Sequence, residues 1–104
     1  MTEEQFSHWY NDLPVLTYGE LDDLELLAYF NIILQWKKDR VFISDKIPDE
    51  QFTVLEYWLL LGLLSPNCIE YGTSPRGAWL TQFGEELLEF LNAGNHLSYI
   101  GEGL

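Results

Sequence analysis

Residues 79–91, with the sequence WLTQFGEELLEFL, carry the strongest fold signal in the chain. Thr81 is placed to cap a helix with its hydroxyl, and Gly84 lets that helix lie close to the segment before it. Apolar residues then recur at helical spacing, with glutamates facing away from them. The stretch therefore predicts a capped amphipathic helix seated on a hydrophobic core. The apolar stripe consists of Phe83, Leu87, Phe90 and Leu91.

A hairpin and another helix are predicted immediately before this stretch. Cys68–Tyr71 and Gly77–Leu80 are short segments that favour strands, and the five residues between them are rich in turn formers. Upstream, Pro48 with acidic residues behind it is typical of a helix start. The apolar pattern then continues from Asp49 to Leu64, until Pro66 stops it. The predicted order is helix, hairpin, helix.

The N-terminal half predicts two further helices and one strand. Residues 1–13 hold a short amphipathic helix, and Glu20–Lys38 is a longer helix that is apolar nearly all round. A helix of that kind is covered on more than one side, so we expect it at the centre of the fold. Residues 41–43 favour a strand, and residues 94–104 form a C-terminal tail. The expected fold class is mainly α with a small β-hairpin, in a single domain spanning residues 1–104.

Residues 59–64, LLLGLL, followed by the hairpin and by residues 79–91, form a pattern that resembles a known family. It is similar to the back half of winged-helix proteins of the MarR and PadR type, in which a third helix, a wing and a capped fourth helix follow one another. The resemblance covers roughly residues 41–93. It implies a winged-helix-like domain with about four helices and a two- or three-stranded wing, and it implies DNA contacts through the third helix and the wing.

The charge of the chain contradicts that implied role. It has 17 acidic residues against five basic ones, for a formal net charge of −12. The helix predicted over 49–64 has no lysine or arginine, whereas duplex binding requires several cations near phosphates and polar side chains in a groove. We therefore expect no binding of duplex DNA through the usual face. Under the alternative of a DNA-binding regulator acting as a dimer, the phosphate contacts would be Lys37, Lys38, Arg40, Lys46 and Arg76.

The sequence offers little catalytic chemistry. His8 and His96 are its only histidines and lie at opposite ends, and no zinc, phosphate-loop or nucleophile motif is present. Cys68 has no histidine near it in sequence and is expected to pack in the core. We therefore expect no enzyme activity, no bound metal and no cofactor.

Composition favours a cytoplasmic protein that has no membrane segment. A single cysteine cannot form an internal disulfide, which fits a reducing compartment. The first residues lack the basic and apolar segments of a secretory signal. The longest apolar stretch, Leu26–Trp36, is shorter than the roughly 20 residues that cross a bilayer.

The leading hypothesis is a small protein-interaction module of regulatory or accessory type. Aromatic residues make up 15% of the chain, and a surplus of Trp and Tyr beyond the needs of a small core favours an interface. The partner is expected to be a protein, which a second copy of the chain could be. An acidic mimic of nucleic acid, bound to a basic protein, stays open as a further alternative. The candidate interface consists of Val54, Tyr57, Trp58, Leu61, Tyr71 and Trp79.

Overall fold

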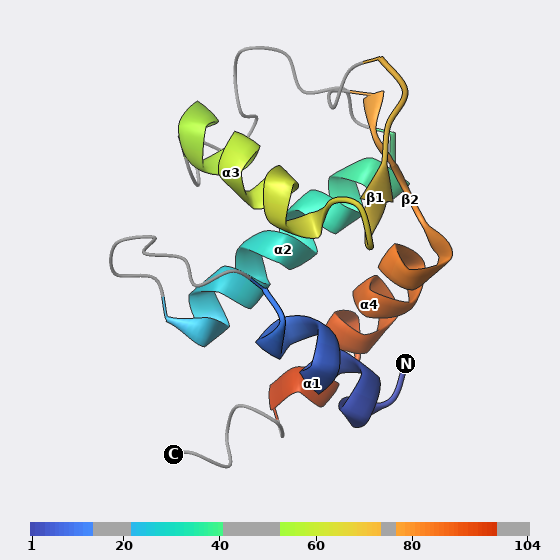
Figure 1. Cartoon of the computed structure of the whole chain (residues 1–104). Coiled ribbons are helices and arrows are strands. Elements are labelled where there is room, and N and C mark those ends of the chain that lie inside the picture. The colour runs from blue at the N-terminus through green and yellow to red at the C-terminus, as the bar shows by residue number, and fades with distance from the viewer. Residues whose placement is uncertain (14–21, 41–52, 74–76, 98–104) are drawn as a thin grey trace.

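The computed structural model describes residues 1–13, 22–40, 53–73 and 77–97. Within these ranges the chain is mainly helical with one small antiparallel hairpin, which confirms the expected fold class (Figure 1). The strand predicted over residues 41–43 lies outside the described residues. The elements in chain order are α1 (Glu3–Asn11), α2 (Asp23–Lys38), α3 (Val54–Leu64), β1 (Ile69–Glu70), β2 (Trp79–Leu80) and α4 (Gln82–Asn92).

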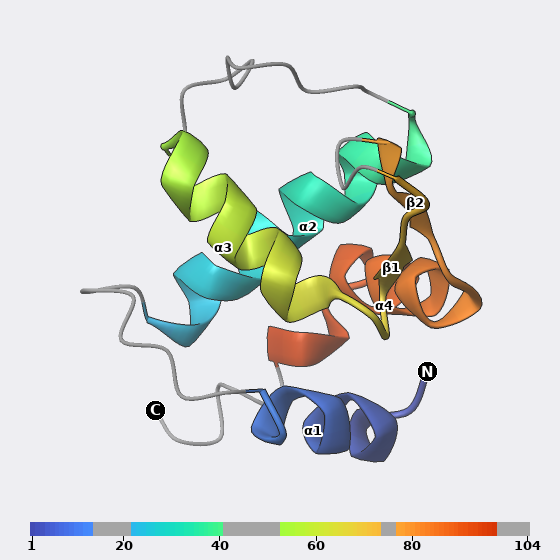
Figure 2. The same cartoon turned by 45° about the horizontal axis from the view of Figure 1, so that its top comes forward.

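Helix α2 runs through the middle of the fold, and α3, α4 and β2 pack against it (Figures 1 and 2). Its buried residues recur at helical spacing along one side, and apolar side chains on the flanks of that side, such as Tyr29 and Trp36, are half-buried. Asp22 has an extended backbone and caps the helix by accepting a hydrogen bond from the Glu25 N–H at 2.8 Å. The helix therefore begins at Asp23, three residues later than the sequence predicted. Its buried apolar residues are Leu27, Phe30, Ile33 and Leu34.

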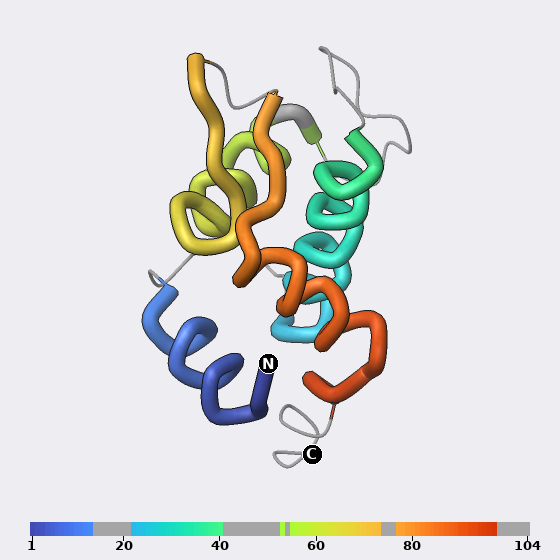
Figure 3. Tube along the Cα trace, turned by 90° about the vertical axis from the view of Figure 1, so that its right-hand side faces the viewer, coloured from blue at the N-terminus to red at the C-terminus, as the bar shows by residue number. Residues whose placement is uncertain are grey.

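Helix α1 belongs to the same core and lies beside α4 (Figure 3). Thr2 and Gln5 form a capping box, in which each side chain accepts a hydrogen bond from the backbone N–H of the other residue. The Phe6 ring stacks on Phe90 of α4, with 4.9 Å between centroids. The Tyr10 hydroxyl donates a hydrogen bond to Asp23 at the start of α2. These contacts hold the N-terminal helix against its own chain.

The start of α3 corrects the predicted helix over Asp49–Leu64. Thr53 has an extended backbone, with φ −74° and ψ 164°, and its hydroxyl accepts a hydrogen bond from the Glu56 N–H at 3.1 Å. This is the geometry of an N-cap, so the helix begins at Val54. Residues 49–52 lie outside the described part of the chain.

The junction between the hairpin and α4 is held by a single threonine. In β1 and β2, Ile69 pairs with Leu80 and Glu70 with Trp79. At the end of β2 the Thr81 N–H donates to the Cys68 carbonyl at 3.0 Å. Its hydroxyl donates to the Asn67 carbonyl at 2.6 Å and accepts from the Gly84 N–H at 3.0 Å. Thr81 therefore caps α4, as predicted, and also ties it to the turn before β1.

Gly84 confirms the close approach that its position in the sequence predicted. A Cβ atom added there would lie 2.0 Å from the backbone oxygen of Cys68, a distance at which no side chain fits. At the other end of α4, Gly94 has a φ of +76°, the left-handed conformation expected of a glycine that ends a helix.

Candidate protein-interaction surfaces

The outward face of α3 is apolar. Leu55 is 68% exposed and Leu59 is 41% exposed, and Gly62 is also exposed one turn further on. Residues at this spacing share one side of a helix, which here lies opposite the buried side. A solvated helix normally presents charged or polar side chains on that face. We call these three residues the α3 outer face.

Two residues of the predicted interface belong to the core instead. Tyr57 is 1% exposed and Leu61 is 3% exposed, so neither presents a surface to a partner, and the prediction for them is wrong. Because α3 is apolar on nearly every side, its sequence contains no polar stripe that would mark the outward face. The sequence therefore did not show that the side carrying Tyr57 and Leu61 is the buried one.

The other predicted interface residues are placed differently. Trp58 is half-buried, and its ring meets Tyr57 edge-on with 5.6 Å between centroids. The side chain of Val54 lies outside the described part of the structure. Tyr71 and Trp79, on the hairpin, are exposed, as a contact surface requires.

The predicted phosphate contacts do not form a cationic surface in the described residues. Lys37 is 3% exposed, and its Nζ lies 5.7 Å from the centroid of the Tyr57 ring. Burial lowers the pKa of Lys37. The prediction of Lys37 as an exposed contact is wrong because its stem packs along the core. Lys38 and Arg40 are exposed at the end of α2, and Lys46 and Arg76 lie outside the described ranges.

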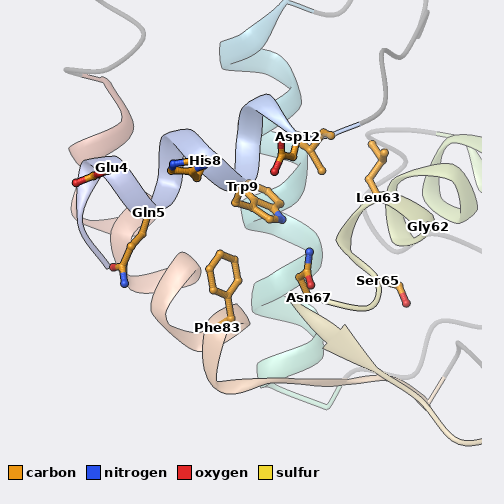
Figure 4. Close-up of a pocket in the computed structure, with 11 residues that line it drawn as sticks. Glu4, Gln5, His8, Trp9, Asp12, Gly62, Leu63, Ser65, Asn67 and Phe83 are labelled. Carbon is orange, nitrogen blue, oxygen red and sulfur yellow. The ribbon is translucent and has the colours of Figure 1, made fainter.

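A groove that the sequence did not reveal lies between α1, the turn after α3 and the start of α4 (Figure 4). Its volume is about 660 Å³. The rings of Trp9 and Phe83 lie at its base, with 6.2 Å between centroids. Three polar residues of α1 and its C-cap are spaced four apart, so they share one side of the helix and line the groove from above. These residues are Glu4, His8 and Asp12.

The wall of this groove that comes from α1 can be recognised in the sequence. Glu4, His8 and Asp12 follow a strict four-residue spacing, which predicts a polar stripe on α1. The opposite wall comes from residues at least fifty positions later, namely Gly62, Leu63, Ser65 and Asn67. Only the packing of α1 against the rest of the chain brings the two walls together.

Burial changes the pKa of two side chains that could act as a nucleophile or a ligand. Cys68 is fully buried, and burial raises the pKa of its thiol to about 12, so it is a packed thiol rather than a nucleophile. Burial lowers the pKa of His96. Among the described residues, no group of three or more histidine, cysteine or acidic side chains could hold a metal ion.

Comparison of the chain with protein-family models, with curated proteins and with solved structures gives no match in any of the three. Within the described ranges, no helix combines the length and the apolar content that crossing a bilayer requires.

Proposed function

We propose that this chain is an acidic, winged-helix-like protein-interaction module of regulatory or accessory type. The partner docks on the α3 outer face and on the exposed aromatic residues of the hairpin. The observation that carries the proposal is that Leu55 and Leu59 face outward from a helix whose outer face would ordinarily be polar.

The order of elements supports the winged-helix part of the proposal. A helix, a short antiparallel hairpin and a helix capped by Thr81 follow one another, as the resemblance to MarR- and PadR-type proteins implies. In such a domain α3 would hold the position of the helix that enters a DNA groove. Its outer face here carries leucines, and apolar side chains of that kind match a protein surface better than base edges and phosphates.

The charge distribution supports a protein partner over duplex DNA. The net charge of −12 repels phosphates at long range and attracts a basic protein. Among the described residues, the exposed lysine and arginine side chains are Lys38 and Arg40, at the end of α2 that lies apart from α3 in Figures 1 and 2. Lys38 and Arg40 by themselves supply fewer phosphate contacts than stable duplex binding uses.

Site-specific photocrosslinking in cells of the source organism tests the proposal. Benzoylphenylalanine replaces Leu59 in one variant and Glu85 in the matched control, since Glu85 is exposed on α4. We expect a discrete crosslinked protein from position 59 and none from position 85. A product of twice the monomer mass would identify the partner as a second copy of the chain. Equal or absent crosslinking at both positions would contradict the proposal.

A duplex-binding measurement tests the alternative. Retardation of mixed-sequence duplexes by the purified chain at low salt, lost when salt is raised, would favour the DNA-binding regulator instead. We expect no retardation.

A further inference from the structure

The groove over Trp9 has an apolar base and an acidic rim. Leu13, Leu63 and Phe83 line it with Trp9, and its carboxylates come from Glu4 and Asp12, both exposed. No lysine or arginine is among the described residues that line it. Its volume of about 660 Å³ lies within the range of about 300–1,000 Å³ that is common for ligand sites. These features fit a ligand that is cationic at one end and apolar along its length.

A buried hydrogen-bond donor adds a second, independent feature. The Trp9 side chain is 7% exposed, and its indole Nε1 is buried without an acceptor within the described structure. Figure 4 shows this nitrogen turned toward Asn67, an exposed residue of the opposite wall. A buried N–H without an acceptor costs free energy, so a carbonyl oxygen that enters between Trp9 and Asn67 gains a favourable partner.

We propose that this groove binds an extended segment of a basic protein partner that carries an arginine or lysine. The aliphatic stem of that side chain lies over the rings of Trp9 and Phe83, as long cationic side chains do on apolar surfaces. Its charged end faces Asp12 and Glu4, and a main-chain carbonyl of the segment accepts the Trp9 N–H. The apolar base therefore binds the aliphatic stem, the acidic rim binds the charged end, and the indole N–H binds the main chain of the segment.

The inference deepens the proposed function and rests on it for the class of partner, but it concerns an adjoining surface that shares only Gly62 with the α3 outer face. The α3 outer face and the groove are probed by different variants. Loss of crosslinking at position 59 therefore tests the proposed function alone, and the groove is tested by a peptide that is too short to cover α3.

The test is a titration of the full chain, followed by two-dimensional ¹H–¹⁵N NMR, with the tripeptide acetyl-Leu-Arg-Leu-amide. The signal of the Trp9 indole N–H is identified as the one missing from the variant Trp9→Phe. We expect millimolar binding that shifts this signal downfield as it gains an acceptor. The matched peptide with Gln in place of Arg should bind about fivefold more weakly, because it loses the charge contact. The matched peptide with Glu should not bind detectably, because its charge is repelled by the rim carboxylates.

A pair of charge-matched variants separates the groove from the general negative field. Glu4→Gln with Asp12→Gln removes both rim carboxylates, whereas Glu85→Gln with Glu89→Gln removes two exposed carboxylates from the far side of α4. We expect the first pair to weaken binding of the arginine peptide about fivefold and the second to leave it within a factor of about 1.5. Equal weakening by both pairs, an unmoved Trp9 signal, or equal binding of the glutamate peptide would each overturn the inference.

Discussion

Two glycines of this chain, Gly84 and Gly62, lie in opposite surroundings. At Gly84 an added Cβ would lie 2.0 Å from the Cys68 carbonyl oxygen, whereas at Gly62 it would meet no atom within 4 Å. The first glycine is required by a closed junction between hairpin and helix. The second lies on the outward side of α3, where it lines the groove and also belongs to the proposed docking face.

The junction at Gly84 is held by backbone contacts, whereas the helix face at Gly62 is exposed. Around Gly84, the Cys68 carbonyl accepts the Thr81 N–H and packs against the backbone of α4, so both strands and the helix are held together. Around Gly62, the neighbouring outward residues are leucines without a covering element in the described structure. An apolar helix face left uncovered beside a junction that is so tightly closed supports the proposed contact with another protein.

Substitution of Gly84 by alanine is expected to have the largest effect. Its methyl group would overlap a backbone carbonyl that is already held by Thr81, so α4 must move away from β1. We expect the free energy of unfolding to fall by about 3 kcal/mol, at the upper end for overpacking. Chemical denaturation measures the change. A loss below about 0.5 kcal/mol would show that the junction yields and that its closeness is not required.

Two leucines of α3 test the inner and outer faces of the helix. Leu61→Ala removes a buried side chain and should cost about 2 kcal/mol, whereas Leu55→Ala removes an exposed one and should cost less than about 0.5 kcal/mol. Alanine favours helix at both positions, so propensity does not separate the variants. The midpoints of urea unfolding at a fixed m-value give the difference. Equal losses would show that the outer face is also covered, as it would be in a tight dimer.

The sequence predicted the C-terminal half of the fold closely because each of its marker residues there is compatible with a single local structure. Thr81 caps a helix, Gly84 permits a close approach, and Gly94 ends the helix with a positive φ. The start of α3 was missed although Thr53 and Glu56 have the spacing of a capping box. The proline and acidic residues at 48–50 formed a competing start signal.

The candidate surfaces were predicted less well, for a physical reason. Periodicity identifies which residues of a helix share a side, but on an apolar helix such as α3 it does not tell which side is buried. Tyr57 and Leu61 were therefore placed outward, although they lie in the core. The groove over Trp9 could be predicted only in part: the spacing of Glu4, His8 and Asp12 marks one wall, but the two walls face each other only through the packing of α1 against α2 and α4.

The thiol at the closed junction gives a pH-dependent test. The pKa of Cys68 is raised to about 12 by burial, so the folded thiol keeps its proton above pH 9, where the unfolded thiol begins to lose its own. Between about pH 9 and 12 the unfolded state therefore binds fewer protons, and stability falls as pH rises, by up to about 1.4 kcal/mol per pH unit.

The Cys68→Ala variant is the control for that slope, because every other titrating group is shared. We expect its stability to fall less steeply than that of the unaltered chain above pH 9. Parallel curves, or fast reaction of the folded thiol with a disulfide reagent at pH 8, would show that the junction admits solvent.

Substitution of Gly62 by alanine should have the smallest effect and the opposite sign. The methyl group would stand in open space on a helix, and alanine restricts the unfolded chain more than glycine does, so we expect a gain of about 0.5–1 kcal/mol. Thermal unfolding at several protein concentrations measures it. A loss of stability that grows with concentration would mean that a second copy packs on the α3 outer face and that the methyl group obstructs it. The same substitution would then strengthen the fold of the isolated chain and weaken its assembly, because the space over Gly62 would be the space that the partner fills.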